Sequence, residues 1–114
     1  MPVLFTQVRE GKLSLRRLVE ATATSPAKIF RLARKGALKE GYDADIALID
    51  PKAKTRIDPE NFLSKARYSP FKGVQCTGKA VYTIVNGALI VEKGHIVGPP
   101  VGKTLKSDSA CISS

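Results

Sequence analysis

The Asn86-Gly87 pair limits the possible folds of this chain more than any other feature, because it separates two apolar runs of strand length. A two-residue type I′ turn needs a positive φ at both central residues, which asparagine and glycine tolerate well. Residues 78–85 precede the pair and residues 88–91 follow it, both as strand-like sequence. The sequence therefore predicts an antiparallel hairpin in this part of the chain.

Further strand signals lie on both sides of this hairpin. Ile46–Ile49 is a continuous apolar run between two acids, which predicts a strand covered on both faces and stopped by Asp50-Pro51. The remaining predictions are a strand near residues 55–57, a helical turn over 58–63, a loop over 68–73, a turn at Lys93-Gly94 and a strand over 95–97.

Helical periodicity is confined to the first third of the sequence. It predicts helices over residues 2–10, 15–23 and 26–34. The expected caps are Ser14 for the second helix and Ser25, followed by Pro26, for the third. The residues expected to face inward are Val3, Leu4 and Val8 in the first helix, Leu15, Leu18, Val19 and Thr22 in the second, and Ile29, Phe30 and Ala33 in the third, which Gly36 should end.

This order of elements predicts an α+β fold, in which N-terminal helices precede a partial β-sandwich or sheet of short strands. With 114 residues, 43% of them hydrophobic and 25% charged, the composition is that of one globular domain. From Gly98 onward the sequence is rich in Gly, Pro and Ser, which predicts a flexible tail.

Charge and targeting signals narrow the possible partners. The net charge is +9, but the longest basic cluster is only Lys28, Arg31, Arg34, Lys35 and Lys39, and aromatic residues do not alternate with the basic ones as stacking platforms would. Nucleic acid is therefore not an expected partner. No apolar run approaches the roughly 18 residues of a membrane helix, and the first residues lack the pattern of a secretory signal. We expect a cytoplasmic protein without a membrane partner.

The sequence offers few groups for catalysis or metal binding. His95 is the one histidine and follows a glycine turn, a position typical of surface residues. Cys76 and Cys111 are not in a CxxC arrangement and are expected to be reduced thiols. Residues 98–104 end in Gly-Lys-Thr, but three residues rather than four separate the two glycines, so a phosphate-binding loop is not predicted.

Three aspartates beside the apolar run are the remaining candidates. Asp45 and Asp50 lie at opposite ends of a strand, roughly 16 Å apart at the usual rise per residue, which is too far to share a metal ion. Asp43 and Asp45 point the same way in an extended chain and could meet one cation. The sequence favours the alternative, in which these carboxylates accept hydrogen bonds from turn amides.

Several motifs together resemble one known family. They are LSLRRLVE at 13–20, TSPAKIF at 24–30, GYDADIALID at 41–50, YSPFKG at 68–73, VYTIVNG at 81–87 and VEKG at 91–94. In this order they resemble the C-terminal part of the cyclic amidohydrolases, and within that superfamily they are most similar to dihydroorotase. Dihydropyrimidinase and allantoinase share the motif at 41–50, so the superfamily is better specified than the subfamily.

The resemblance implies an architecture and an activity. Residues 1–35 would match the end of a TIM barrel, residues 36–97 the C-terminal part of a β-sandwich, and residues 98–114 a tail. Full-length members hold zinc through histidines, a lysine and an aspartate, and interconvert dihydroorotate and carbamoyl aspartate in pyrimidine biosynthesis. None of those ligand motifs occurs here, so the resemblance assigns this chain no catalytic, cofactor-binding or metal-binding residue.

Two functions follow as hypotheses. The first is a C-terminal segment of a dihydroorotase-like enzyme that is inactive alone, with no cofactor of its own. Its expected partners are a second copy of the chain or the missing barrel portion of the parent enzyme. The second is a non-catalytic interaction or nucleic-acid-binding module derived from such an enzyme, for which the net charge of +9 is the main argument.

Overall fold

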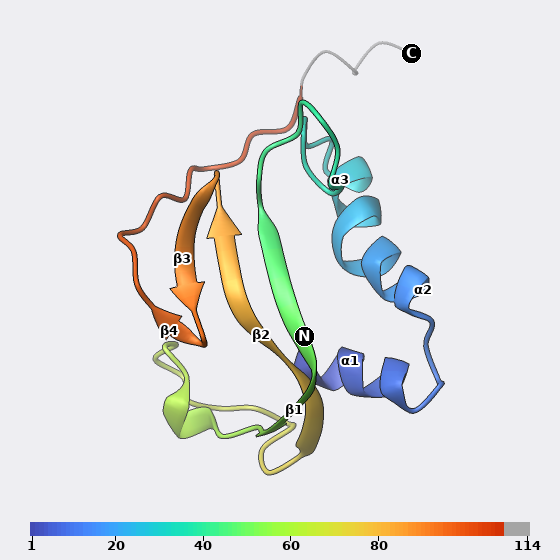
Figure 1. Ribbon diagram of the computed structural model, residues 1–114, viewed down its shortest axis with the longest axis vertical. Helices are drawn as coiled ribbons and strands as arrows, with labels where there is room; N and C mark the ends of the chain where they lie inside the picture. The colour runs from blue at the N-terminus through green and yellow to red at the C-terminus, as the bar shows by residue number, and fades with distance from the viewer. Residues whose placement is uncertain (109–114) are drawn as a thin grey trace.

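The computed structural model describes residues 1–108, and Cys111 lies outside them. The helical elements are α1 (Pro2–Arg9), α2 (Leu15–Val19), the π-helical segment η1 (Glu20–Thr24), α3 (Ser25–Ile29) and the 3₁₀ turn η2 (Pro59–Asn61). The strands are β1 (Ile46–Arg56), β2 (Gln75–Val85), β3 (Ala88–Glu92) and β4 (His95–Ile96). They form one antiparallel four-stranded sheet in the order β1-β2-β3-β4, with the helices to one side (Figure 1). The α+β class is confirmed, and the strands of the described residues make one layer.

The predicted hairpin joins β2 to β3. Asn86 has φ 49° and Gly87 has φ 80°, as a type I′ turn requires. The Lys93-Gly94 turn repeats this geometry between β3 and β4, with φ values of 51° and 82°. Both turns are confirmed, because a two-residue turn of this kind depends on local conformational preference alone.

Strand β1 differs from its prediction in two ways. It continues through Asp50-Pro51 to Arg56, because register shifts after Leu48 and between Asp50 and Lys54 leave Pro51 without a partner in β2. A proline at such an irregularity breaks no ladder hydrogen bond. The expected cover on both faces is also wrong, since no β1 residue is buried and Leu48 is 50% exposed. β1 forms an edge of the sheet and has β2 as its one neighbour.

The predicted break between the second and third helices is wrong. Ser25 has helical backbone angles, and its side chain caps nothing. Its amide donates instead to the carbonyl oxygen of Glu20, which continues the π-helical segment between α2 and α3. Pro26 lies in the first turn of α3, as predicted. Because proline has no amide hydrogen to donate, the wider π turn lets the chain pass Pro26 without ending the helix. Ser14 caps α2 as predicted, accepting from the Arg17 amide at 3.1 Å.

The third helix is shorter than predicted. It ends at Ile29, and Arg31 has a positive φ of 52°. Ile29 and Phe30, which helical periodicity placed inward, are 73% and 64% exposed. The early end removes the turn that would have pointed them at the core, and Ala27 is the buried residue of this segment.

The buried hydrophobic core of the described residues consists of Phe5, Leu18, Ala27 and Cys76, and Pro59 and Gly78 are also buried. The Phe5 ring lies on Gly78 of β2 so closely that a Cβ atom there would stand 2.2 Å from the ring. Next to this contact, the Thr6 hydroxyl oxygen accepts from the Thr77 amide at 2.9 Å. These contacts fix α1 on β2. The predicted inward face of α1 missed Phe5 and included Leu4, which is 43% exposed, because the sheet and not the helix decides which face is covered.

The segment after β4 returns along the sheet toward the end of the helices (Figure 1). It has no helix or strand up to residue 108. The Asn86 side-chain amide donates to the Val101 carbonyl oxygen at 3.0 Å, and the Asp108 amide donates to the Arg31 carbonyl oxygen at 2.9 Å. The flexibility that the sequence predicts here stays a prediction. Among the described residues, no helix has the length and apolar character that crossing a bilayer requires.

Candidate functional site

The aspartates that the sequence singled out meet a lysine. We call Lys35, Asp43, Asp45 and Asn86 the Lys35 cluster. Lys35 comes from the segment after α3, the two aspartates precede β1, and Asn86 belongs to the β2–β3 turn. The Lys35 ammonium group contacts both carboxylates, at 3.1 Å from Asp43 and more closely from Asp45. The cluster therefore joins three separate parts of the chain.

Asp45 is held from two sides. The Asn86 amide donates to one carboxylate oxygen at 2.8 Å, and the Lys35 ammonium group donates to the other. The hydrogen bond from Asn86, and then that from Lys35, hold the pKa of Asp45 below its ordinary value. The Asp45 carboxylate in turn raises the pKa of Lys35, with a smaller contribution from Asp43. Both groups are therefore charged at neutral pH.

Asp43 binds both Lys35 and its neighbour Arg34. Besides Lys35, its carboxylate meets the Arg34 guanidinium group at 3.3 Å, and its amide donates to the Arg34 carbonyl oxygen at 3.0 Å. Asp43 and Asp45 do share one cation, as their spacing allowed, and that cation is the Lys35 ammonium group. Sequence reasoning counted Lys35 as part of a basic surface, because no local pattern shows that its side chain is only 17% exposed.

Asp50 is separate from the cluster. Its carboxylate accepts from the Lys52 amide at 2.9 Å within the irregular part of β1. Asp45 and Asp50 thus act at opposite ends of the apolar run, and each accepts a backbone amide, as the structural interpretation of the sequence predicted.

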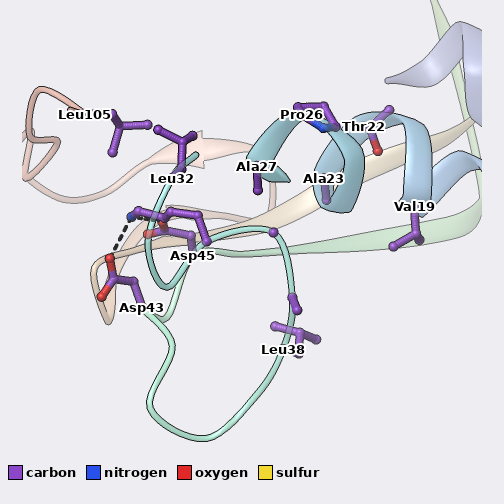
Figure 2. A pocket seen from close by; sticks show the side chains of 13 residues that line it. Val19, Thr22, Ala23, Pro26, Ala27, Leu32, Leu38, Asp43, Asp45 and Leu105 are labelled. Atoms are coloured by element: carbon purple, nitrogen blue, oxygen red, sulfur yellow. Dashed lines mark hydrogen bonds and ion pairs between the residues drawn. The ribbon is translucent and has the colours of Figure 1, made fainter. Parts of the chain in front are cut away.

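A partly open cavity of about 380 Å³ adjoins the cluster. Val19, Ala23 and Ala27 point into it from the helix, and Leu105 enters from the segment after β4 (Figure 2). Its lining is mainly apolar, and its charged members are Lys35, Asp43 and Asp45. Lys35 contacts both carboxylates, and Arg34 outside the lining contacts Asp43 as well, so each charged group of the cavity wall already has a partner of opposite charge.

The other candidate residues remain apart. His95 is exposed on the short strand β4, and Cys76 is a buried free thiol on β2. Residues 1–108 contain no group of three or more His, Cys, Asp or Glu side chains placed to hold a metal ion. Gly98 to Thr104 lie in an irregular segment that no helix follows within residues 1–108.

Comparisons with known proteins place these features in context. A family model described as the amidohydrolase family matches residues 1–90. The chain is 41% identical to L-hydantoinase from Paenarthrobacter aurescens over 99 residues, which cover 85% of this chain and 22% of that protein. It is 42% identical to dihydroorotase from Bacillus subtilis over 97 residues, which cover 84% of this chain and 22% of that protein. The chain therefore spans about a fifth of the length of the curated relatives that it matches.

Solved structures agree with the sequence comparisons. The structure of L-hydantoinase (dihydropyrimidinase) from Arthrobacter aurescens matches 86% of this chain and 22% of its own, with a TM-score of 0.80 and 41% identity. The inactive dihydroorotase-like domain of the Chaetomium thermophilum CAD-like multifunctional protein matches 96% of this chain and 28% of its own, with a TM-score of 0.64 and 17% identity. At 17% identity, the second match shows a shared fold and nothing more.

Proposed function

Because the chain belongs to the amidohydrolase family, as a dihydroorotase-like member of it, we propose that it is a structural segment of a cyclic-amide hydrolase and is inactive by itself. The parent reaction would be the one for which the relatives are named: water adds to a ring amide carbonyl and the ring C–N bond breaks. Dihydroorotate, in pyrimidine biosynthesis, is the substrate that the resemblance favours. Catalytic groups would come from parts of the enzyme outside this chain.

The Lys35 cluster is the observation that carries this proposal. Asp43 and Asp45 form the acidic part of the sequence motif at 41–50, and both are bound to one ammonium group. A carboxylate that serves as a general base needs a free lone pair directed at the reacting water. In Asp45, one carboxylate oxygen accepts from the Lys35 ammonium group and the other accepts from the Asn86 backbone amide. The motif therefore acts in the fold, where it ties the helical part of the chain to β1 and to the β2–β3 turn.

Zinc, which the resemblance implies for full-length members, needs a set of converging ligands. Zinc sites in hydrolases use about three protein ligands, mostly histidines and carboxylates, that converge on one point. No such group exists within residues 1–108, and His95 lies alone on β4. The described residues do not fit the metal, so no step that passes through zinc is assigned to this chain.

The domain organisation is proposed on the same basis. Residues 1–35 would form the end of the barrel region of the parent enzyme, residues 36–97 would form the C-terminal part of its β-sandwich, and residues 98–114 would be a tail. The exposed Ile29 and Phe30 at the end of α3 support the first assignment, because two large apolar side chains in water need a covering surface. The Leu48 side chain on β1, half exposed, supports the second.

The proposal that the chain is inactive by itself is tested by measuring the activity and the zinc content of the isolated chain. The purified 114-residue chain is assayed with dihydroorotate and with hydantoin, with Bacillus subtilis dihydroorotase as the positive control. We expect no turnover above the buffer rate and no stoichiometric zinc by elemental analysis. Turnover together with one or more zinc ions per chain would overturn the proposal.

A chimera tests the structural role directly. Residues 1–90 replace the matching segment of the Bacillus subtilis dihydroorotase, to which the chain is 42% identical. We expect the chimera to hydrolyse dihydroorotate. Adding Lys35→Ala should lower its melting temperature and leave kcat within about twofold, since a structural contact acts on folding and not on the barrier. A loss of kcat with unchanged stability would show that the cluster serves catalysis.

A second candidate function is that of an interaction or nucleic-acid-binding module. Its main support is the net charge of +9. The structure reduces the free charge of the basic segment, because Arg34 and Lys35 are bound to Asp43. Binding to a single-stranded RNA that weakens steeply with added salt would support this function. No binding at low salt would rule it out.

A further inference from the structure

The helical segment and the sheet of this chain are only loosely joined. The accessible surface is 8875 Å², whereas a folded monomer of 12.3 kDa is expected to expose about 6,100 Å². Among the described elements, α1 packs on β2 and α2 packs on α1, but neither α2 nor α3 packs closely on a strand. Contacts that bridge the sheet and the end of α3 therefore determine how these two parts lie. One such bridge is the Lys35 cluster, and a second is the segment after β4.

The segment after β4, residues 98–108, is attached to the fold at both ends, and we call it the strap. Where it begins, the Val97 amide donates to the Ile90 carbonyl oxygen at 2.9 Å. Where its description ends, the Asp108 amide donates to the Arg31 carbonyl oxygen at 2.9 Å. The strap thus leaves the sheet beside β3 and reaches the residues that follow α3 (Figure 1). It spans the two parts that are otherwise loosely joined.

The β2–β3 turn attaches the middle of the strap. The Asn86 side-chain amide donates to the Val101 carbonyl oxygen at 3.0 Å. The backbone amide of the same residue donates to the Asp45 carboxylate at 2.8 Å. Asn86 therefore contacts both bridges, the strap through its side chain and the Lys35 cluster through its backbone.

The residues at the start of the strap suit a docked segment. Gly98 lies so near β3 that a Cβ atom there would stand 2.9 Å from the Leu89 carbonyl oxygen. Pro99 and Pro100 follow it, and their fixed φ angles reduce the number of conformations that a released strap can adopt. Fewer released conformations lower the entropic cost of docking. The glycine and prolines that predict a flexible tail are thus compatible with a docked one.

Leu105 is the apolar contact of the strap. It lines the cavity of about 380 Å³ together with Leu32, at the end of the cavity that lies away from Val19 (Figure 2). Leu105 is 55% exposed, so it covers this end without filling the cavity. A side chain that is about half covered gains about half of the free energy of full burial. The strap is therefore held weakly enough to open while the rest of the chain stays folded.

We propose that residues 98–108 act as a strap that opens and closes as one unit. The hydrogen bonds at Val101 and Asp108 and the Leu105 contact form and break together, while the hydrogen bond of Val97 stays in place. The closed strap holds the end of α3 to the sheet and covers one end of the cavity. In the open form that end is uncovered, and of the two bridges the Lys35 cluster remains. The strap does not rest on the proposed function, because amide exchange reports its closure whether or not the parent enzyme is a hydrolase.

Amide hydrogen exchange at Asp108, followed by NMR in the full chain, tests this closure. Asn86→Gly keeps the backbone amide and suits the positive φ of 49°, but it removes the side-chain donor to Val101. The Asp108 amide, far away in the sequence, should then exchange at least about threefold faster. Lys93→Gly is the matched control, because it makes the same change at the first position of the other two-residue turn, where φ is 51°. It should leave Asp108 unchanged, and the Val97 amide should keep its rate in both variants.

A second pair of variants tests the apolar contact. Leu105→Ala should accelerate exchange at Asp108 by at least about threefold, because less apolar surface is covered in the closed form. Leu63→Ala makes the same change at a loop residue that is 91% exposed, and it should have no effect. Circular dichroism checks that each variant is folded. The proposal would be overturned by an Asp108 amide that exchanges as fast as in an unfolded peptide, by a response to only one of the two strap variants, or by an equal response to the controls. A parallel acceleration at Val97 would also overturn it, because the opening would then include β4.

Discussion

Asp45 connects three segments that lie apart in the sequence. Its carboxylate is 37% exposed, so each of its two interactions is weakened by water and contributes modestly to stability. These two interactions fix where distant segments lie, because they hold the β2–β3 turn and the segment after α3 at the start of β1. The Gly87 amide reinforces the same junction, donating to the Ala44 carbonyl oxygen at 3.0 Å.

The pKa of Asp45 gives this junction a pH dependence. A carboxyl group whose pKa is lower folded than unfolded stabilises the protein above its unfolded pKa, about 4. That stability is lost as the pH falls through the folded value. We expect the free energy of unfolding, measured with urea, to drop from pH 5 toward pH 3. Asp45→Asn should flatten this drop, whereas Asp50→Asn, which removes a carboxylate without a cation partner, should keep it.

Gly78 is the second residue with a specific role. Its φ of 105° is unfavourable for any other residue, and the Phe5 ring occupies the space of a side chain. Gly78→Ala should therefore destabilise the chain by about 2 kcal/mol or more, since it combines backbone strain with displacement of the α1 contact. Gly102→Ala is the control, because no atom lies within 4 Å of its new Cβ. Equal urea midpoints for the two variants would contradict this account of α1 packing.

At the scale of elements, the sheet and the helical segment are built differently. β2 lies between β1 and β3 and also carries α1. The segment 15–29 buries Leu18 and Ala27, and the π turn replaces part of its regular hydrogen bonding. Elements with few buried contacts open at lower free energy than the central part of a fold.

Amide hydrogen exchange should resolve this difference. We expect amides in 15–29 to exchange through local opening, at rates well above those of β2 residues 79–85. Addition of moderate urea should accelerate β2 far more than the helix, because global unfolding exposes more surface than local opening. If both elements exchange at one rate with one urea dependence, the helix and sheet form a single cooperative unit and the expectation is wrong.

The same division explains which elements were predictable from sequence. The two glycine turns and the Ser14 cap follow from the preferences of adjacent residues, and the sequence predicted them correctly. The burial of Phe5 and the contacts of Lys35 depend on segments far away in the chain, for which no local pattern exists. Pro26 suggested a helix break, but the surrounding turns absorb a missing amide by widening. The backbone amides that Asp45 and Asp50 accept agree with the sequence prediction, whereas the Lys35 partner of Asp45 was missed.

At the scale of the whole molecule, an incomplete core should be measurable as a small heat capacity of unfolding. Among the described residues, the buried hydrophobic core consists of Phe5, Leu18, Ala27 and Cys76, and Pro59 and Gly78 are the other buried residues. An unfolded chain of this mass exposes about 17,800 Å², so folding removes about three quarters of the surface that a compact monomer would remove. Heat capacity and the urea m value both scale with that area.

For 114 residues, a compact domain has a heat-capacity change of about 1.5 kcal/mol/K, and we expect about 1.1 kcal/mol/K here. The m value should fall in the same proportion. Both are measured at several protein concentrations, because self-association would add buried surface. A full-sized heat-capacity change at the lowest concentration would mean that the chain closes on itself in solution, with less accessible surface than 8875 Å².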